Sequence, residues 1–186
     1  MDYEPRKLGP KKCRSRNSQE LSLAAELIGS ALVFGCQSSF ELNKPGDNPT
    51  HPFHVNSQSL WGVKYQMLQG MLIAERWLIE FLLGPPKNKQ DDDICVDCFS
   101  QNWRFPKGAI ANELFQRQKT INKLVLHPTW EFLQAEPRHW TLTRIDRCIQ
   151  GLNTFADGIA KEWPDATNVL KKHVDSAATI LQLELP

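Results

Sequence analysis

One helical stretch carries side chains that could perform acid–base chemistry near its C-terminal end. Residues 116–127 read QRQKTINKLVLH, and Lys123 and His127 are four positions apart, so they would share one helix face. Histidine titrates near neutral pH and can act as a general acid or base, while the lysine can hold a phosphate. The structural alternative is a basic residue that ends a helix before Pro128 and stabilises the helix dipole without chemistry.

Two pairs of potential metal ligands form a second candidate site. Cys95 and Cys98 are separated by two residues, as are His51 and His54, and the four together could bind zinc. The helix predicted between the pairs is about 40 Å long, which would keep them at opposite ends. We therefore expect free thiols, no bound metal and no cofactor, with a zinc-stabilised interaction module as an alternative. A thioredoxin-type redox site would need a strand and a helix around the two cysteines, and the sequence does not predict them.

Hydrophobic periodicity predicts that helices position these residues, and it predicts no strand of useful length. The expected helices run from about 17 to a loop at 41–54, then over about 57–83, 108–127 and 142–162, and from a cap at Asp165 to about 181. The fourth helix has the clearest buried stripe, formed by Ile145, Ile149, Leu152 and Phe155. The fold class is therefore all-α, a single-domain helical bundle of about five helices with a long loop, 84–107, between the second and third.

Composition limits the classes of protein that the chain can belong to. It has 186 residues, 41% of them hydrophobic and 23% charged, which is typical of one globular domain. Residues 1–16 hold six Lys or Arg and are expected to be a flexible basic tail, with the bundle domain at 17–186. The net charge of +1 gives the whole chain no strong field for nucleic acid.

Location is predicted from what the sequence lacks. No apolar run of transmembrane length stands out, and the N-terminal residues do not resemble a signal peptide. Five cysteines without framework spacing favour a reducing compartment. We therefore expect a cytoplasmic protein without membrane contact.

A longer stretch around the candidate helix resembles a known superfamily. The segments DDDICVDCFSQNWRFP, TINKLVLHPTW and HWTLTRIDRCIQGLNTF are similar to a group of uncharacterised bacterial helical proteins, over roughly residues 57–160. In those proteins an acidic loop with a tryptophan precedes a helix that bears Arg-x-Asn-Lys-x-x-x-His, a pattern similar to the HEPN superfamily. The resemblance implies a small helical bundle that forms a homodimer. In HEPN ribonucleases the motif faces its copy across the dimer and cleaves RNA without metal.

Carried over residue by residue, the resemblance assigns three positions and leaves one empty. Asn122, Lys123 and His127 match the motif, whereas Thr120 stands where the arginine belongs. Without a guanidinium to stabilise charge on the phosphate, the resemblance implies a catalytically degenerate binding protein with an RNA or protein partner in a toxin or defence setting. The alternative is a metal-independent endoribonuclease that uses His127 with Lys123 or Arg117. If two copies met as in HEPN dimers, Thr120→Arg should raise its ribonuclease activity.

Overall fold

The chain folds into a helical bundle, as its periodicity predicts. The computed structural model describes residues 16–43, 58–84, 94–101, 103–126 and 145–182, and the side chains at 41–43, 58–65 and 122–126 are not described. Its helices are α1 (Ser18–Asn43), α2 (Gln58–Leu83), α3 (Ala109–Leu126), α6 (Ile145–Ile159) and α7 (Pro164–Leu181), with a single-turn 3₁₀ helix η1 (Val96–Cys98). The described residues contain no strand, which confirms the all-α class.

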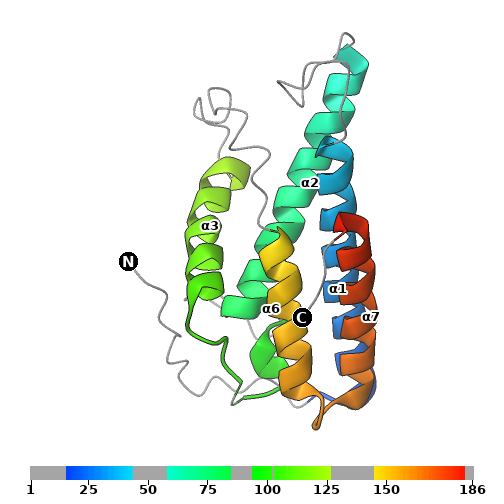
Figure 1. Cartoon of the computed structure of the whole chain (residues 1–186), viewed down its shortest axis with the longest axis vertical. Helices are drawn as coiled ribbons and strands as arrows, with labels where there is room; N and C mark the ends of the chain where they lie inside the picture. Colours follow the sequence, from blue (N-terminus) through cyan, green and yellow to red (C-terminus); the bar gives the residue numbers. More distant parts are fainter. Residues whose placement is uncertain (1–15, 44–57, 85–93, 102, 127–144, 183–186) are drawn as a thin grey trace.

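The helices alternate in direction along the chain. In Figure 1, α1, α3 and α7 run upward and α2 and α6 run downward, so consecutive helices are antiparallel. The helix α1 packs most extensively against α7 and then against α2, while α3 lies on α2 and also touches α6. The two helices farthest apart in sequence are therefore neighbours, and α3 lies on the other side of α2 and α6 from α7 (Figure 1).

Local signals fix the ends of several helices. The capping box at α1 is confirmed, because the Asn17 N–H donates to Glu20 Oε2 at 3.0 Å and the Glu20 N–H donates to Asn17 Oδ1 at 2.9 Å. Helix α2 ends at Leu83, and the next residue is Gly84, whose φ of +88° suits a residue without a side chain. The prediction that Asp165 caps the last helix is wrong. Trp163 occupies the N-cap without a side-chain bond, and Pro164 begins α7 because its missing N–H needs no partner there.

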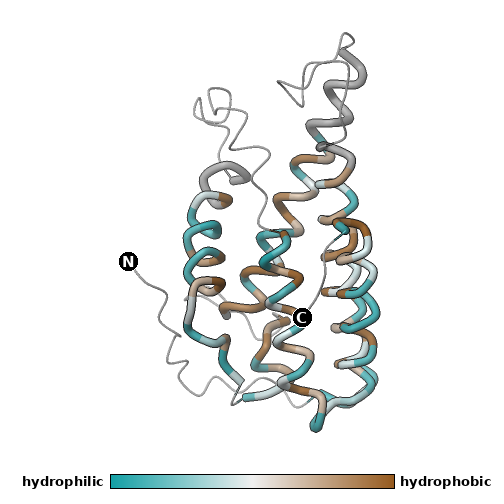
Figure 2. Tube along the Cα trace, in the orientation of Figure 1, coloured by the Kyte–Doolittle hydropathy of each residue, from teal (hydrophilic) through white to brown (hydrophobic). Residues whose placement is uncertain are grey.

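The predicted stripe of α6 is confirmed as core. Ile145 is 1% exposed, and Ile149, Leu152 and Phe155 are 0% exposed. Helix α3 changes between hydrophilic and hydrophobic turns, whereas α2 is hydrophobic along most of its coloured length (Figure 2). A helix apolar around most of its circumference usually lies at the centre of a bundle, and α2 does contact α1, α3 and α6.

The segment between α2 and α3 contributes to the core, a role that the sequence analysis did not assign to it. Phe99 and Trp103 of this segment form T-shaped pairs with Phe155 of α6, with ring centroids 5.4 Å and 4.9 Å apart. Phe81 of α2 joins the same cluster, 5.1 Å from Phe155. Two glycines of α6 leave room for this segment, since a Cβ at Gly151 would meet Phe105 and one at Gly158 would overlap the Trp103 indole. The segment therefore closes one end of the bundle.

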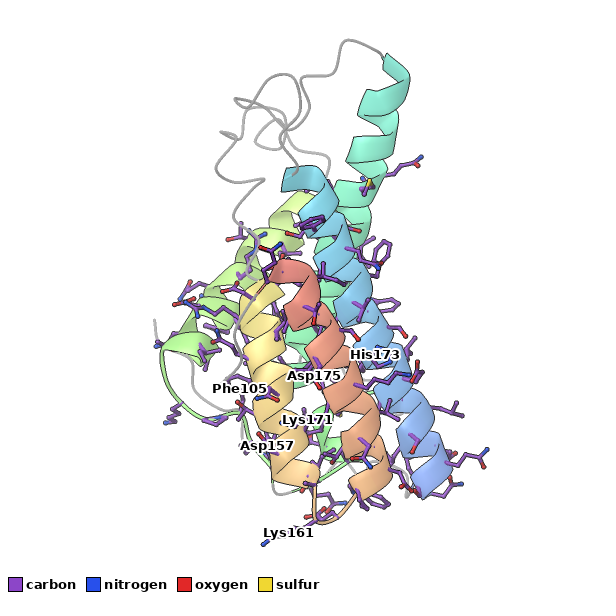
Figure 3. All side chains as sticks on the ribbon, turned by 45° about the vertical axis from the view of Figure 1, so that its right-hand side comes forward. Phe105, Asp157, Lys161, Lys171, His173 and Asp175 are labelled. Carbon is purple, nitrogen blue, oxygen red and sulfur yellow. The ribbon has the colours of Figure 1, made fainter. Side chains whose placement is uncertain are left out.

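A glycine also sets the close approach of α1 and α7. A Cβ at Gly29 would overlap the ring of His173, so the histidine lies directly on the α1 backbone. Its Nε2 is 3.0 Å from Glu26 Oε1. Figure 3 shows His173 where α7 faces α1, and Lys171 where α7 faces α6, with Lys171 Nζ 2.8 Å from Asp157 Oδ1. These contacts fix α7 in the groove between its two neighbours.

Candidate functional site

The predicted acid–base site lies at the C-terminal end of α3, where the described residues stop. Asn122 and Lys123 lie in α3 by their backbone, but their side chains are not described, and His127 lies outside the described residues. Up to that point α3 has one polar and one apolar face: Gln116, Lys119 and Thr120 are exposed, while Leu114 and Ile121 on the opposite face are buried. Thr120, at the position of the motif arginine, donates a hydrogen bond from its hydroxyl to the Gln116 carbonyl at 3.4 Å.

Arg117, the other proposed partner of His127, is engaged in the protein interior. Its Nε donates to Glu75 Oε1 at 2.8 Å and its Nη2 donates to Glu75 Oε2 at 3.1 Å, a bidentate pair. Glu75 is 0% exposed and Arg117 is 9% exposed. A ribonuclease role for Arg117 would require this buried pair to break, which leaves a carboxylate without its counter-charge. Arg117 therefore binds α3 to α2 and is not available to an RNA phosphate.

The buried ion pair was missed, although the sequence contains a signal for it. Glu75 occupies a core position of α2, between Leu72 and Leu78, and Arg117 occupies a core position of α3, between Leu114 and Ile121. Opposite charges at core positions of two adjacent helices predict an interhelical pair. We had considered Arg117 only as a possible partner of His127.

Two thiols share this region of the interior. Burial, with a smaller contribution from the Asp146 charge, raises the pKa of Cys36 to about 12. Burial also raises the pKa of Cys148 well above its ordinary value, with Glu75 adding to the shift and Arg117 opposing it. Both cysteines are 0% exposed. They are neutral core residues and poor nucleophiles.

Every guanidinium group among the described residues is paired with a carboxylate. The five described arginines form the pairs Arg16–Glu20, Arg76–Glu80, Arg104–Asp97, Arg117–Glu75 and Arg147–Glu113, at 3.6, 2.9, 3.0, 2.8 and 2.7 Å. Recognition of RNA phosphates depends strongly on such groups. The described part of the chain therefore offers little arginine to a phosphate backbone.

Large apolar side chains gather instead on an outer face of α1 and α2. We call this set the apolar face: Leu23, Leu27 and Phe34 of α1, and Ile73 and Trp77 of α2, which are 65%, 49%, 48%, 41% and 52% exposed. At 100° per residue, the three α1 members lie within about 40° of one another, as do the two α2 members. The Phe34 ring lies against Gly70, one turn from Ile73, where a Cβ would be 3.0 Å from two ring carbons. The two halves of the face therefore meet at this contact.

The polar residues beside the apolar face are mostly uncharged. Ser30 and Gln37 of α1 and Gln66 of α2 are exposed and uncharged, whereas Glu26, exposed between Leu23 and Leu27, lies 3.0 Å from His173 Nε2. The nearest charges on α2, Arg76 and Glu80, form an ion pair at 2.9 Å. Apolar area with few unpaired charges is typical of the centre of a protein–protein interface. Trp77 lies on the apolar arc of α2 and is 52% exposed.

Helix α1 also passes a simple test for a membrane span. Among the described residues, its segment Ser18–Phe40, 23 residues long, has the length and composition to cross a bilayer, so the expectation that no run reaches this length is wrong for α1. However, 44% of its most apolar 18-residue window is buried inside the bundle, and core helices of globular proteins can have the same length and composition. The cytoplasmic location stays a prediction.

The candidate zinc ligands are only partly described. Cys95 and Cys98 lie at the start and end of the η1 turn, with their Sγ atoms 3.8 Å apart. Within the described ranges no three His, Cys, Asp or Glu side chains gather as a metal site would require. His51 and His54 lie outside the described residues, so the zinc alternative stays a prediction.

Comparison of the chain with protein-family models, curated proteins and solved structures gave no match.

Proposed function

We propose that the protein is a HEPN-like, catalytically degenerate binding protein whose apolar face joins two copies of the chain into a homodimer. The observation that carries the proposal is the exposure of Trp77 at 52%, beside Phe34 and Ile73, where the nearest charges on α2 are paired with each other. Tryptophan is enriched among the residues that dominate binding energy at protein interfaces. Exposed apolar patches rimmed by polar residues are also typical of interaction sites.

A second copy of the chain suits this face better than a membrane or RNA does. An isologous interface brings a surface against itself, so any net charge on it would repel its copy. The described neighbours of the apolar face are mostly hydroxyl and amide side chains and the Arg76–Glu80 pair, which produce no such repulsion, and the one carboxylate among the α1 neighbours, Glu26, lies 3.0 Å from His173 Nε2. A membrane-surface helix usually carries Lys and Arg beside its apolar residues, and α1 has none from Ser18 to Asn43. Arginine is the preferred group for RNA phosphates, and the described arginines are already paired with carboxylates.

The position of the face argues for binding over RNA cleavage. Glu75 points to α3 through its pair with Arg117, whereas Ile73 and Trp77 lie about 200° around α2 from it, on the opposite side. A dimer that forms through the apolar face keeps the two α3 helices on its outer sides. The two histidines of the motif would then not share one cleft, which HEPN-type cleavage requires. The missing arginine at Thr120 supports the same conclusion.

The test is the mass of the full chain in solution, measured by light scattering or sedimentation at micromolar concentrations. We expect a dimer for the wild type and a monomer for Phe34→Glu and Trp77→Glu, because a buried carboxylate without a partner opposes association. Phe40→Glu is the matched control: Phe40 lies on the same helix at 41% exposure, but about 120° away from Phe34. This variant should remain a dimer.

Three outcomes would overturn the proposal. A wild type that is monomeric at all accessible concentrations has no self-association to explain. A dimer that persists in both Phe34→Glu and Trp77→Glu uses another surface. A monomer that floats with vesicles of neutral lipid, and loses that property on Trp77→Glu, binds a membrane through this face and not its own copy.

A further inference from the structure

The two cysteines of the CVDC segment lie in direct contact at the closed end of the bundle. Their sulfurs are 3.8 Å apart, within the range of a weak S–H···S hydrogen bond in which either thiol can donate. Cys98 N–H donates to the Cys95 carbonyl at 2.9 Å, which closes the turn between them. Residues at the two ends of such a turn have Cα atoms less than about 7 Å apart, and most disulfides need about 4.4–6.8 Å. The backbone therefore already holds the pair at disulfide distance.

The two thiols differ in exposure, so that one can react first with a molecule from solvent and the other can react second with its neighbour. Cys95 is 1% exposed, whereas Cys98 is partly exposed and can meet a small molecule from solvent. Asp97, which lies between them, is paired with Arg104 at 3.0 Å, so its negative charge is balanced close to the thiols. An unbalanced carboxylate there would oppose formation of a thiolate.

The other two described cysteines make a natural contrast within the same chain. Cys36 and Cys148 are 0% exposed, and burial raises the pKa of each thiol. Neither can be reached by a reagent in the folded protein. Any reactivity of the native protein toward a thiol reagent at these four positions should therefore begin at Cys98.

We propose that Cys95 and Cys98 are a redox-active dithiol that exchanges with a low-molecular-weight disulfide and closes to an intramolecular disulfide. The Cys98 thiolate attacks one sulfur of the disulfide RSSR, which forms a Cys98–S–S–R bond and releases one RS⁻. The Cys95 thiol loses its proton to solvent and attacks the Cys98 sulfur, which forms the Cys95–Cys98 bond and releases the second RS⁻. The protein loses two electrons and two protons, and one RSSR becomes two RSH.

Closure requires only a small local movement. The sulfurs must approach from 3.8 Å to the roughly 2.05 Å of a disulfide bond, a distance that a change in side-chain rotamer can cover. The site differs from a thioredoxin-type site, because the pair lies on a 3₁₀ turn and not between a strand and a helix. The turn leads directly into Phe99, which packs on Phe81 and Phe155 and accepts a hydrogen bond from Trp163 on its carbonyl. Oxidation would thus lock the turn that starts the core segment.

The test uses the full-length reduced protein, which is equilibrated with defined ratios of glutathione and glutathione disulfide, quenched with acid and alkylated. Peptide mass spectrometry should show that the fragment with Cys95 and Cys98 loses two hydrogens as the ratio becomes more oxidising, while Cys36 and Cys148 stay reduced. In Cys95→Ser the mixed disulfide on Cys98 should accumulate at several times its wild-type level. In Cys98→Ser the buried Cys95 should stay unmodified.

The wild-type titration tests the proposal even if a variant fails to fold, which circular dichroism would reveal. Alkylation of both cysteines at every ratio would overturn it, since no disulfide then forms. A glutathione adduct that remains on wild-type Cys98 would also overturn it, because Cys95 then does not resolve the intermediate. Stoichiometric zinc that survives dialysis and is lost on Cys95→Ser would identify the pair as metal ligands instead.

Discussion

The two sides of α2 reverse the usual distribution of polarity. On the side toward α3, the charged Glu75 is 0% exposed and is paired with Arg117. On the opposite side, Trp77 is 52% exposed and Ile73 is 41% exposed. Charged residues are almost never fully buried unless paired, and large exposed apolar groups that cluster mark interaction sites.

The contrast shows that each side of α2 has a different task. A buried ion pair adds little net stability over an apolar contact, but it penalises every arrangement in which its partners separate. We infer that it specifies how α3 docks on α2. The apolar side leaves about half of each large side chain exposed, so much of its surface is open to a partner. We propose that the same helix organises the bundle on one side and associates with a second copy on the other.

Removing one partner of the ion pair should have the largest effect on stability. Glu75→Ala leaves Arg117 buried without a counter-charge, and such a change should lower the free energy of unfolding by about 3–5 kcal/mol. Chemical denaturation monitored by circular dichroism measures the loss.

The matched control removes both charges. Glu75→Met with Arg117→Met fills the space with apolar groups, and it should be neutral or stabilise the protein by up to about 4 kcal/mol. If Glu75→Ala lowered stability by less than about 0.5 kcal/mol, the pair would not be buried in solution and the contrast across α2 would fail.

The next prediction compares the loss of an apolar side chain in the core with the loss of one on the apolar face. Leu152→Ala deletes a 0% exposed side chain and should lower the free energy of unfolding by about 2–5 kcal/mol. Trp77→Ala deletes a larger side chain on the apolar face, and it should change the stability of the monomer by no more than about 0.5 kcal/mol. Denaturant melts at a concentration low enough to avoid association measure both. A large loss for Trp77→Ala would mean that the face belongs to the core.

The buried thiols should make the stability of the protein depend on pH in the alkaline range. Burial raises the pKa of Cys36 to about 12 from an ordinary 9.0, so the native thiol stays neutral where the unfolded one ionises. Stability is therefore intact below pH 9 and falls above it, by about 1.4 kcal/mol per pH unit for each such thiol until the native pKa is reached. Cys36→Ala should flatten the decline between pH 9 and 10.5 relative to wild type. Equal slopes would mean that Cys36 is not buried in solution.

The sequence predicted those parts of the fold that depend on one helix at a time. The α6 stripe and the Asn17–Glu20 capping box follow from local spacing, and both are confirmed. Composition and spacing do not show which helices pack against each other, or which side of a helix stays exposed. Helix α2 is apolar on most sides, and its pattern alone does not show that Trp77 is 52% exposed while Leu78 and Ile79 are buried.

The parts that were missed depend on contacts between distant segments. Trp103 joins the core only because Gly158, far along the chain, leaves space for its indole. Cys95 and Cys98 were compared with zinc and thioredoxin patterns, whereas their contact depends on the 3₁₀ turn that the structure reveals. In the α3 motif, the exposed position of Thr120 follows from helical spacing. Which surface covers that face of α3 depends on association between chains, and one sequence does not show it.

The smallest expected effect concerns the arginine that the HEPN-like motif lacks. Thr120 is exposed and makes only a 3.4 Å bond to the Gln116 carbonyl, so Thr120→Arg should change stability by no more than about 0.5 kcal/mol. Cleavage of a labelled single-stranded RNA in the presence of a metal chelator should be absent in the wild type, which lacks the guanidinium. It should stay absent in Thr120→Arg, because a dimer through the apolar face holds the two α3 helices apart. Metal-independent cleavage by Thr120→Arg that disappears in Thr120→Arg with His127→Ala would reverse this conclusion. The two motif faces would then meet in one cleft, the dimer axis would lie beside α3, and the apolar side of α2 would need another partner.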